Sequence, residues 1–313
     1  MPPEISIVIP THQREQLLEL TLDSLLAQTI APDRFEVVVV DNYPVPYKPS
    51  EQLCRAEKYA SLRLTCRHHP ILGLSEARNF GIRFASAPLV GFIDDDEKLP
   101  PHWIELALEI SRACAPDIFG GPYRPYYLEP KPAWFKDQYL SLILDQAKGW
   151  TENKRCLFGG NMIFRQEWLR RLKGFSTEYG RNGVNREYGE ETEIQMRAYQ
   201  AGARIYYDPE LFIYHYAHPD RLEASWYLTS AWYHGKAKAR MYPAGSGFRH
   251  AGAIFRKLGG DAFKVIGRYL LIPFRDRKSA PTLQNYLVQS IAPLISVLSM
   301  SWYLFLFSLR MSR

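Results

Sequence analysis

The sequence predicts an α/β protein with a mostly parallel central sheet and helices on both of its faces. Short apolar segments, typical of strands buried on both faces, alternate with longer segments of helical periodicity along the first 115 residues. Such alternation favours parallel strands, because each helix returns the chain to the same edge of the sheet. With 313 residues, of which 46% are hydrophobic, the chain can bury a sizeable core in one large domain or two.

The predicted elements follow one another in a regular order. Strands are predicted at residues 5–9, 36–40, 62–66 and 89–93. Helices are predicted at residues 18–26 and 75–85, and from the Pro100–Pro101 pair to about Cys114. Pro10 is expected to end the first strand, and Thr11 is a candidate cap for the next helix. Ligands of such sheets bind at the carboxyl ends of the strands, where Pro10, Thr11, Asp41 and Asp94–Asp96 are expected.

Four consecutive acids, Asp94–Glu97, follow the strand at residues 89–93. Along an extended backbone the side chains at i and i+2 point the same way, which would place Asp94 and Asp96 on one side. Two carboxylates there suit Mg²⁺ or Mn²⁺, whose other positions water and phosphate oxygens could fill. A solvated acidic loop is the structural alternative.

No glycine-rich phosphate-binding loop follows either of the first two strands. A bound nucleotide would therefore be neutralised by a metal and by arginine. Arg14 and Arg78 are the candidates, and an ordinary surface position is the alternative for each.

The middle of the chain combines an aromatic segment with a second strand-and-helix region. Residues 115–158 are rich in Pro, Tyr and Trp, and could form an acceptor-binding loop or simply pack their aromatic rings onto the domain. A strand re-enters at residues 158–164, where the glycines allow a ligand to approach the backbone closely. Glu190 and Glu191 then begin a helix that ends at Gly202, and they serve either as a catalytic base or as partners of the helix dipole.

A strand that ends in His215 follows, and an aromatic helix at residues 226–239 comes after it. A histidine at this position is either a structural residue or a metal ligand. His218 is a competing candidate for the second role.

Several of these segments resemble the motifs of family 2 glycosyltransferases, in that family's order and spacing. They are residues 9–14 (IPTHQR), 40–42 (VDN), 73–81 (GLSEARNFG) and 92–97 (FIDDDE), and with later motifs the resemblance covers roughly residues 4–240. It implies a GT-A fold, a nucleotide-diphospho-sugar donor, a divalent metal and inversion at the anomeric carbon. We expect UDP as the nucleotide of the donor.

The resemblance also implies roles for single residues. Thr11 and Asp41 would contact the nucleoside, Asp94 the ribose, and Asp96 the Mn²⁺ or Mg²⁺ ion that bridges the diphosphate, with His215 completing the metal site. Asp95 and Glu97 would be mainly structural. The complete predicted donor site consists of Pro10, Thr11, Arg14, Asp41, Arg78, Asp94, Asp95, Gly160 and Asn161.

The second acidic cluster looks like the family's Glu-Asp motif, although Glu191 stands where Asp is commoner. We assign Glu191 as the base that deprotonates a hydroxyl of a glycan or lipid-linked acceptor, with Glu190 as its neighbour. Two alternatives stay open at this point: a sugar nucleotidyltransferase, although its glycine-rich loop is missing, and a non-catalytic scaffold of a polysaccharide assembly complex. The Q-x-x-R-W segment of processive relatives is also missing, which favours addition of single sugars.

The charge is distributed unevenly. Residues 236–313 contain 13 Lys or Arg and two Asp, a net charge of +11, whereas residues 1–235 carry −5. Residues 291–309 are mostly apolar, so the tail is expected to associate with a membrane, by spanning it or by lying in the interface, and burial in the core is the third option. Nucleic-acid binding is not expected. We predict a glycosyltransferase domain at 1–235, a basic helical extension at 236–280 and a membrane-associating segment at 281–313.

The scattered cysteines and the absence of a signal-peptide pattern at Met1 favour the cytoplasmic face of the membrane.

Overall fold

The computed structural model describes residues 1–45, 48–144, 146–151, 157–180, 188–240, 284 and 287–311. They pack into two compact units. Unit 1 comprises residues 1–126, 140–185 and 190–216, and unit 2 comprises residues 127–139, 186–189 and 217–313.

Unit 1 is built on a central sheet of eight strands in the order β3-β2-β1-β4-β9-β6-β10-β8. The strands are β1 (Ile5–Thr11), β2 (Phe35–Asp41), β3 (Arg63–His68), β4 (Leu89–Phe92), β6 (Ile118–Gly120), β8 (Gly149–Trp150), β9 (Met162–Arg165) and β10 (Ile205–Tyr207). β1, β2, β3 and β4 pair in parallel, and so do β6 and β10, whereas β9 runs antiparallel to both β4 and β6. The expected mostly parallel sheet is therefore present.

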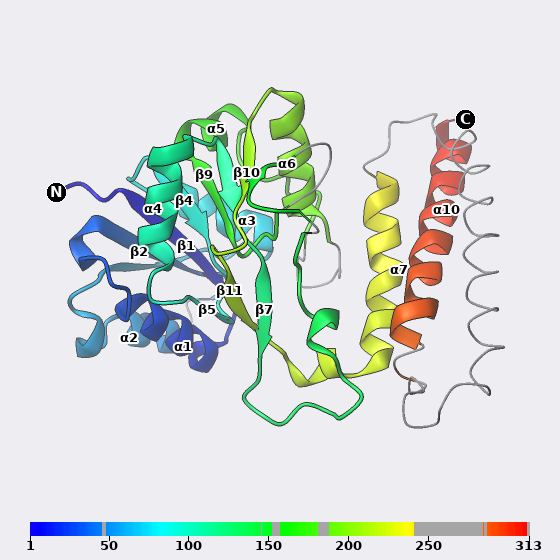
Figure 1. Cartoon of the computed structure of the whole chain (residues 1–313), viewed down its shortest axis with the longest axis horizontal. Helices are drawn as coiled ribbons and strands as arrows, with labels where there is room; N and C mark the ends of the chain where they lie inside the picture. Colours follow the sequence, from blue (N-terminus) through cyan, green and yellow to red (C-terminus); the bar gives the residue numbers. More distant parts are fainter. Residues whose placement is uncertain are drawn as a thin grey trace. The chain divides into compact units, whose positions relative to one another are not determined.

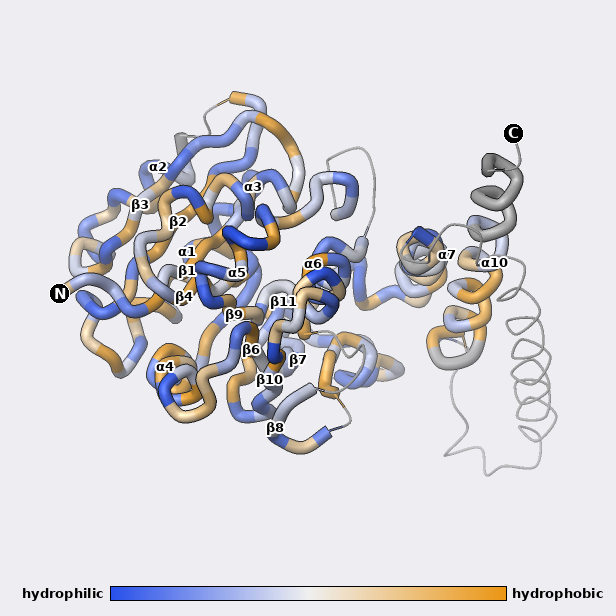
Figure 2. Tube along the Cα trace, turned by 90° about the horizontal axis from the view of Figure 1, so that it is seen from above, coloured by the Kyte–Doolittle hydropathy of each residue, from blue (hydrophilic) through white to orange (hydrophobic). Residues whose placement is uncertain are grey.

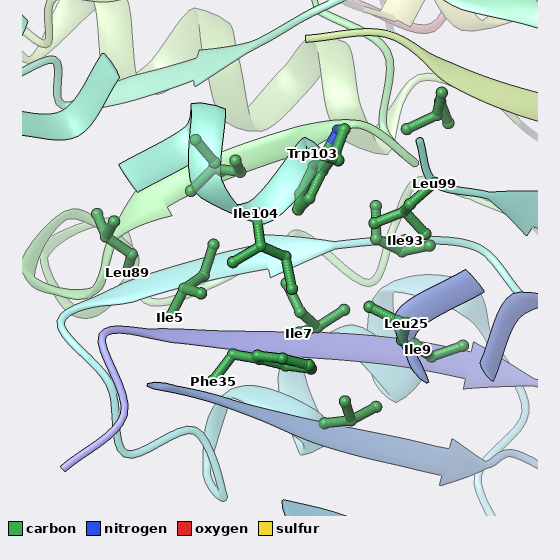
Figure 3. Close-up of a cluster of buried hydrophobic side chains, with 14 of the residues drawn as sticks. Ile5, Ile7, Ile9, Leu25, Phe35, Leu89, Ile93, Leu99, Trp103 and Ile104 are labelled. Atoms are coloured by element: carbon green, nitrogen blue, oxygen red, sulfur yellow. The ribbon is translucent and has the colours of Figure 1, made fainter. Parts of the chain in front are cut away.

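Helices cover both faces of this sheet (Figure 1). They are α1 (Glu15–Leu26), α2 (Lys48–Cys54), α3 (Leu74–Ile82), α4 (Trp103–Cys114), α5 (Gln166–Arg171) and α6 (Glu190–Gln200). Alternate residues of β1 point to opposite faces. Ile5, Ile7 and Ile9 pack with α1 and with Trp103 and Ile104 of α4 (Figure 3), whereas Val8 packs with α3, α5 and α6.

Two predictions about the end of the first strand were wrong. β1 nevertheless continues through Pro10 to Thr11. The backbone nitrogen of Pro10 faces β4, but the last residue pair between β1 and β4 is Val8 with Phe92. No N–H is therefore needed at Pro10 to bond a neighbouring strand. Thr11 is part of β1, and α1 begins after Arg14 without a side-chain cap. The Thr11 hydroxyl instead donates to Asp95 Oδ2 at 2.8 Å.

Residues 115–158 contribute β6, β7 and β8, and β7 belongs to a second, small sheet. This sheet has the order β5-β11-β7, formed by Glu97–Lys98, Ile213–Tyr216 and Tyr123–Tyr126. β5 has only two residues, and its pairing with β11 joins segments that are far apart in the sequence. This small sheet organises the candidate site.

Unit 2 contains α7 (Ala224–Arg240) and α10 (Ala292–Met311), which lie side by side, with a turn of π-helix at Leu287–Ile291 before α10. Gly235 permits this close approach, because a Cβ there would lie 2.1 Å from the backbone oxygen of Ser296. The Ser299 hydroxyl donates to Trp232 O at 2.6 Å. Figure 2 shows hydrophobic and more polar residues mixed along the coloured part of α10. Within the described parts of the chain, no helix is sufficiently long and apolar to cross a bilayer.

The aromatic segment contributes residues 127–139 to unit 2. There Phe135 is buried and packs against Tyr139 and Tyr227, as the packing interpretation of this segment expects. Most of the predicted basic extension at 236–280, namely residues 241–280, lies outside the described residues. The division into three domains stays a prediction.

Candidate active site

The acidic segment Asp94–Glu97 lies at the carboxyl edge of the parallel strands. The N–H of Ile93 still bonds Val8 O at 3.2 Å, and the chain then turns at Asp95–Asp96 before entering β5. The extended conformation expected for Asp94–Asp96 is therefore absent. The turn nevertheless brings Asp94 and Asp96 together, since one ligand atom from each lies within 4.8 Å of the other.

Two further residues, Glu97 and His215, complete this group. Glu97 in β5 pairs directly with His215 in β11, and Tyr216 N donates to Asp96 O at 2.8 Å. His215 Nε2 lies 3.3 Å from Asp96 Oδ1. Among the described residues, the ligand atoms that come within 4.8 Å of one another are those of Asp94, Asp96, Glu97 and His215, and we call these residues the cation group. His218 is not part of this group.

Glu97 is the site residue that the sequence argument missed. Its side chain is fully buried, and Oε2 accepts a hydrogen bond from Asp94 N at 2.8 Å. Within the described residues, Oε1 has no hydrogen-bond partner. Burial and the charge of Asp94 raise the pKa of Glu97 well above its usual value. A buried carboxylate oxygen without a hydrogen-bond donor is energetically unfavourable, and a bound cation would compensate for the missing donor.

Asp95 is held by residues of β1, of α1 and of the segment between them. Oδ2 accepts the Thr11 hydroxyl, and Oδ1 lies 3.2 Å from Arg14 Nη1, which also approaches Asp96 Oδ2 at 3.3 Å. The carbonyl of Asp95 accepts the Thr21 hydroxyl at 3.0 Å. Burial and the neighbouring Asp96 raise the pKa of Asp95 to about 7. These contacts fix the turn relative to the start of α1.

Asp41 is buried at the end of β2, beside Thr11 in the parallel register. The next residue, Asn42, was not predicted to matter for the geometry. Its amide donates to His69 O and Ile71 O, and its Oδ1 accepts the N–H of Gly73 at 2.9 Å. Asn42 thus ties the segment before α3 to the strand that carries Asp41.

Arg78, on α3, is buried beneath the acidic groups. Its Nη2 lies 3.0 Å from Asp94 Oδ1, and its Nη1 lies 3.2 Å from Glu190 Oε1. From the sequence, Arg78 was a candidate for neutralising a bound nucleotide; in the structure its terminal nitrogens contact two carboxylates.

Glu190 and Glu191 occupy the first turn of α6, as expected. Glu190 is buried against Arg78, and Glu191 is half-buried and hydrogen-bonded to Glu190. Burial, followed by the charge of Glu190, raises the pKa of Glu191 to about 8. A carboxylate with this pKa can accept a proton near neutral pH, which is the property required of a general base.

Gly160 and Asn161 were both predicted to contact the donor, but the structure gives them different surroundings. A Cβ on Gly160 would lie 2.0 Å from Glu97 Oε1, so this position accommodates the cation group. Asn161 is fully buried and hydrogen-bonds inward, to Trp103 Nε1 at 3.1 Å, Pro122 O at 3.2 Å and Leu211 O at 2.6 Å. We therefore correct the role of the Asn161 side chain to a structural one.

The charge balance indicates what the site can bind. Among the described residues, six carboxylates, from Asp94–Glu97, Glu190 and Glu191, are opposed by the guanidinium groups of Arg14 and Arg78. Three carboxylates and an imidazole in one group are ligands that suit Mn²⁺ or Mg²⁺, and the partnerless Glu97 Oε1 fits such an ion.

Comparison with known sequences agrees with this geometry. Residues 6–173 match the model of Glycosyl transferase family 2. The chain is 26% identical over 263 residues to the glucosyl-dolichyl phosphate glucuronosyltransferase of Haloferax volcanii, covering 79% of this chain and 81% of that protein. It is 27% identical over 290 residues to the succinoglycan biosynthesis protein ExoM of Rhizobium meliloti, covering 90% of each.

Solved structures share the fold. The mannosyltransferase PcManGT of Pyrobaculum calidifontis, solved with GDP-Man and Mn²⁺, superposes with a TM-score of 0.61 at 19% identity, over 96% of this chain and 88% of that one. TarS of S. aureus, solved with UDP-GlcNAc, gives a TM-score of 0.55 at 18% identity, over 74% and 65%. Since the family model matches more than half of the chain, this protein belongs to the family 2 glycosyltransferases and is a glycosyltransferase of the GT-A fold.

Proposed function

We propose that this chain is a divalent-cation-dependent, inverting glycosyltransferase that uses a nucleotide-diphospho-sugar as donor. The observation that carries the proposal is the position of the cation group, which Arg78 links to the Glu190–Glu191 pair. An inverting transfer needs these two parts close together, because the leaving diphosphate and the attacking hydroxyl lie on opposite sides of the anomeric carbon.

Asp94, Asp96, Glu97 and His215 would hold the cation. When bound, Mn²⁺ or Mg²⁺ supplies positive charge that stabilises the departing diphosphate. The complex of PcManGT with GDP-Man and Mn²⁺ supports this choice of ion. Glu97 enters this set on the basis of its partnerless oxygen. The other members were expected from the sequence: Asp94 and Asp96 from their spacing, and Asp96 and His215 from the family resemblance.

Glu191 acts as the base. Its carboxylate takes the proton of the acceptor hydroxyl as that oxygen forms a bond to the anomeric carbon. The bond from the anomeric carbon to the phosphate oxygen breaks at the same time, and the nucleoside diphosphate leaves with the electron pair. The raised pKa of Glu191, about 8, makes this carboxylate a stronger base than an exposed glutamate.

The nucleoside would bind at the carboxyl edge of β1 and β2, where Thr11 and Asp41 are adjacent, with Arg14 nearby. Pro10 belongs to this edge, and Asp94 would lie by the ribose as well as in the cation group. UDP is our preferred nucleotide, and the TarS complex with UDP-GlcNAc supports a test of it first.

The acceptor is a glycan or a lipid-linked glycan. The names of two relatives support this class, since one transfers glucuronosyl groups to glucosyl-dolichyl phosphate and the other belongs to succinoglycan biosynthesis. The acceptor hydroxyl would approach Glu191 from the side opposite the diphosphate.

Unit 2 would attach the enzyme to the membrane, at its cytoplasmic face. α7 and α10 contain no Asp or Glu, and Trp232, Leu298 and Trp302 are exposed on them. Tryptophan and basic residues together favour an interface with anionic lipid. Co-flotation of the full chain with phosphatidylglycerol vesicles, but not with phosphatidylcholine vesicles, is the expected result, and absence of flotation with both would contradict this part of the proposal.

Transfer is tested by incubating the purified chain with UDP-, GDP- and dTDP-sugars, with Mn²⁺ or with EDTA. We expect cation-dependent donor binding and slow donor hydrolysis with one nucleotide. Glu191→Gln should abolish transfer while donor binding persists, whereas Asp96→Asn should weaken cation-dependent binding. Transfer retained by Glu191→Gln would refute the base assignment.

A further inference from the structure

Arg78 is buried between the two acidic parts of the site. Its side chain is 1% exposed, and its two terminal nitrogens each contact one carboxylate, Asp94 at 3.0 Å and Glu190 at 3.2 Å. The two carboxylates come from the turn after β4 and from the first turn of α6. One guanidinium therefore connects the cation group to the acidic pair.

Other described residues also lie against the Arg78 guanidinium. The guanidinium lies over the Phe175 ring, 5.4 Å from its centroid. A Cβ on Gly159 would lie only 3.3 Å from both Nη1 and Nη2, so the chain passes directly against them. Arginine suits this position because its planar fork reaches two acceptors at fixed directions, which the single ammonium of lysine does not.

The ion pairs also act on the neighbouring Glu191. Among the described residues, the charged groups facing Glu191 are Glu190, on its own helix, and Arg78, from α3. The negative charge of Glu190 favours a proton on Glu191, and the positive charge of Arg78 opposes it. Removal of Arg78 would leave Glu190 as a buried charge without its partner, which both disorders the first turn of α6 and favours protonation of Glu191.

We propose that Arg78 is a positioning residue, which holds Glu190, and through it the base Glu191, at a fixed place relative to Asp94 of the cation group. The inference rests on the proposed function, in which Glu191 is the base. It replaces the phosphate contact expected from the sequence and assigns Arg78 to turnover rather than to nucleotide affinity.

Arg78→Met removes the charge, and Arg78→Lys keeps the charge but loses one of the two contacts. We expect kcat to fall about 100-fold or more in Arg78→Met and less in Arg78→Lys, since small displacements of a catalytic group have effects of this size. The acid limb of the pH profile of kcat/KM should move to higher pH in Arg78→Met alone. The Kd for UDP with Mn²⁺, from calorimetry, should stay within about threefold of the wild type.

Arg83, exposed at the end of the same helix, provides the matched control, and Arg83→Met should change none of these quantities. A loss of UDP affinity as large as the loss of kcat/KM, with an unmoved acid limb, would overturn the inference in favour of a phosphate contact.

A double-mutant cycle keeps the test decisive if Arg78→Met does not fold. Arg78→Lys and Glu190→Ala should be non-additive, both in turnover and in the melting temperature of the protein without metal or donor, because they break the same contact. Additive losses in both would overturn the inference. If Glu191 is not the base, Glu191→Gln would retain transfer, while the melting temperatures would still show the Arg78–Glu190 coupling. The experiments therefore distinguish a wrong base assignment from a wrong role for Arg78.

Discussion

Gly160→Ala is expected to damage the cation group with little effect on the rest of the fold. A Cβ at this position would lie 2.0 Å from Glu97 Oε1 and 2.7 Å from Glu97 Cδ. The carboxylate must therefore move by about 1 Å or more to reach a normal contact distance. Because Glu97 is fully buried and accepts a hydrogen bond from Asp94 N at 2.8 Å, this movement disturbs both the bond and the ligand position.

The size of each expected effect depends on whether the group that meets the new methyl can move. The neighbour of the new methyl group is a side chain rather than backbone, so the free energy of unfolding should fall by only about 1–3 kcal/mol, as for other overpacked sites. Displacement of a metal-ligand carboxylate should weaken Mn²⁺ binding about 10- to 100-fold, or about 1.4–2.7 kcal/mol. In Gly120→Ala, by contrast, the methyl group would meet the backbone oxygen of Asn161 at 2.1 Å, and general destabilisation is expected.

Calorimetric titration of Mn²⁺ in the presence of UDP measures the loss of Mn²⁺ affinity, and urea unfolding measures the loss of stability. Gly91→Ala is the matched control, since its nearest neighbour is Ile7 Cδ1 at 3.2 Å and it lies in the hydrophobic core. In a Glu97→Gln background, Gly160→Ala should cause no further loss of Mn²⁺ affinity. An affinity of Gly160→Ala within twofold of the wild type would refute the assignment of Glu97 to the cation group.

Three other predictions concern single side chains. Glu191 must be deprotonated to act as a base, and its pKa is raised to about 8, so kcat/KM should rise about tenfold per pH unit well below pH 8 and level off above it; a flat profile between pH 6 and 9 would contradict the base assignment. Asn161→Ala removes the acceptor of Trp103 Nε1 and the donor to two buried carbonyls, and should lower the free energy of unfolding by about 2–4 kcal/mol, measured in urea, while donor affinity of the folded protein changes less than threefold; a selective loss of donor affinity would restore its predicted contact role. Trp302→Ala should reduce flotation with anionic vesicles without changing donor affinity, and unchanged flotation would exclude this side chain from the membrane contact.

Where the sequence was informative, the signal was local. The strands at β1, β2 and β4 were predicted to within two residues because an uninterrupted apolar segment is what a doubly covered parallel strand requires. The positions of Thr11, Asp41 and Asp94 at one edge followed from parallel pairing alone, and the register of β1 with β2 agrees with it. The helix that begins at Glu190 followed from its acidic first turn.

The predictions that failed concern the direction in which side chains point and the pairing of strands, rather than the positions of helices and strands. Pro10 does not end its strand, because the pairing of β1 with β4 has already ended at Val8. The local sequence does not reveal where this pairing ends. Asn161 points into the core, toward Trp103, and the adjacent glycine faces the cation group, although both positions looked equivalent beside a ligand.

By itself, the sequence determined the fold class, the family and the segments that carry the acidic residues, because each depends on contiguous residues with a clear pattern. Only the tertiary structure decided that Glu97 joins Asp94, Asp96 and His215, and that Arg78 lies between Asp94 and Glu190. The physical reason lies in the two-residue strand β5. A strand of this length is stabilised by its pairing with β11 rather than by its own residues, so it leaves no periodic signal, and yet this pairing places His215 against Glu97.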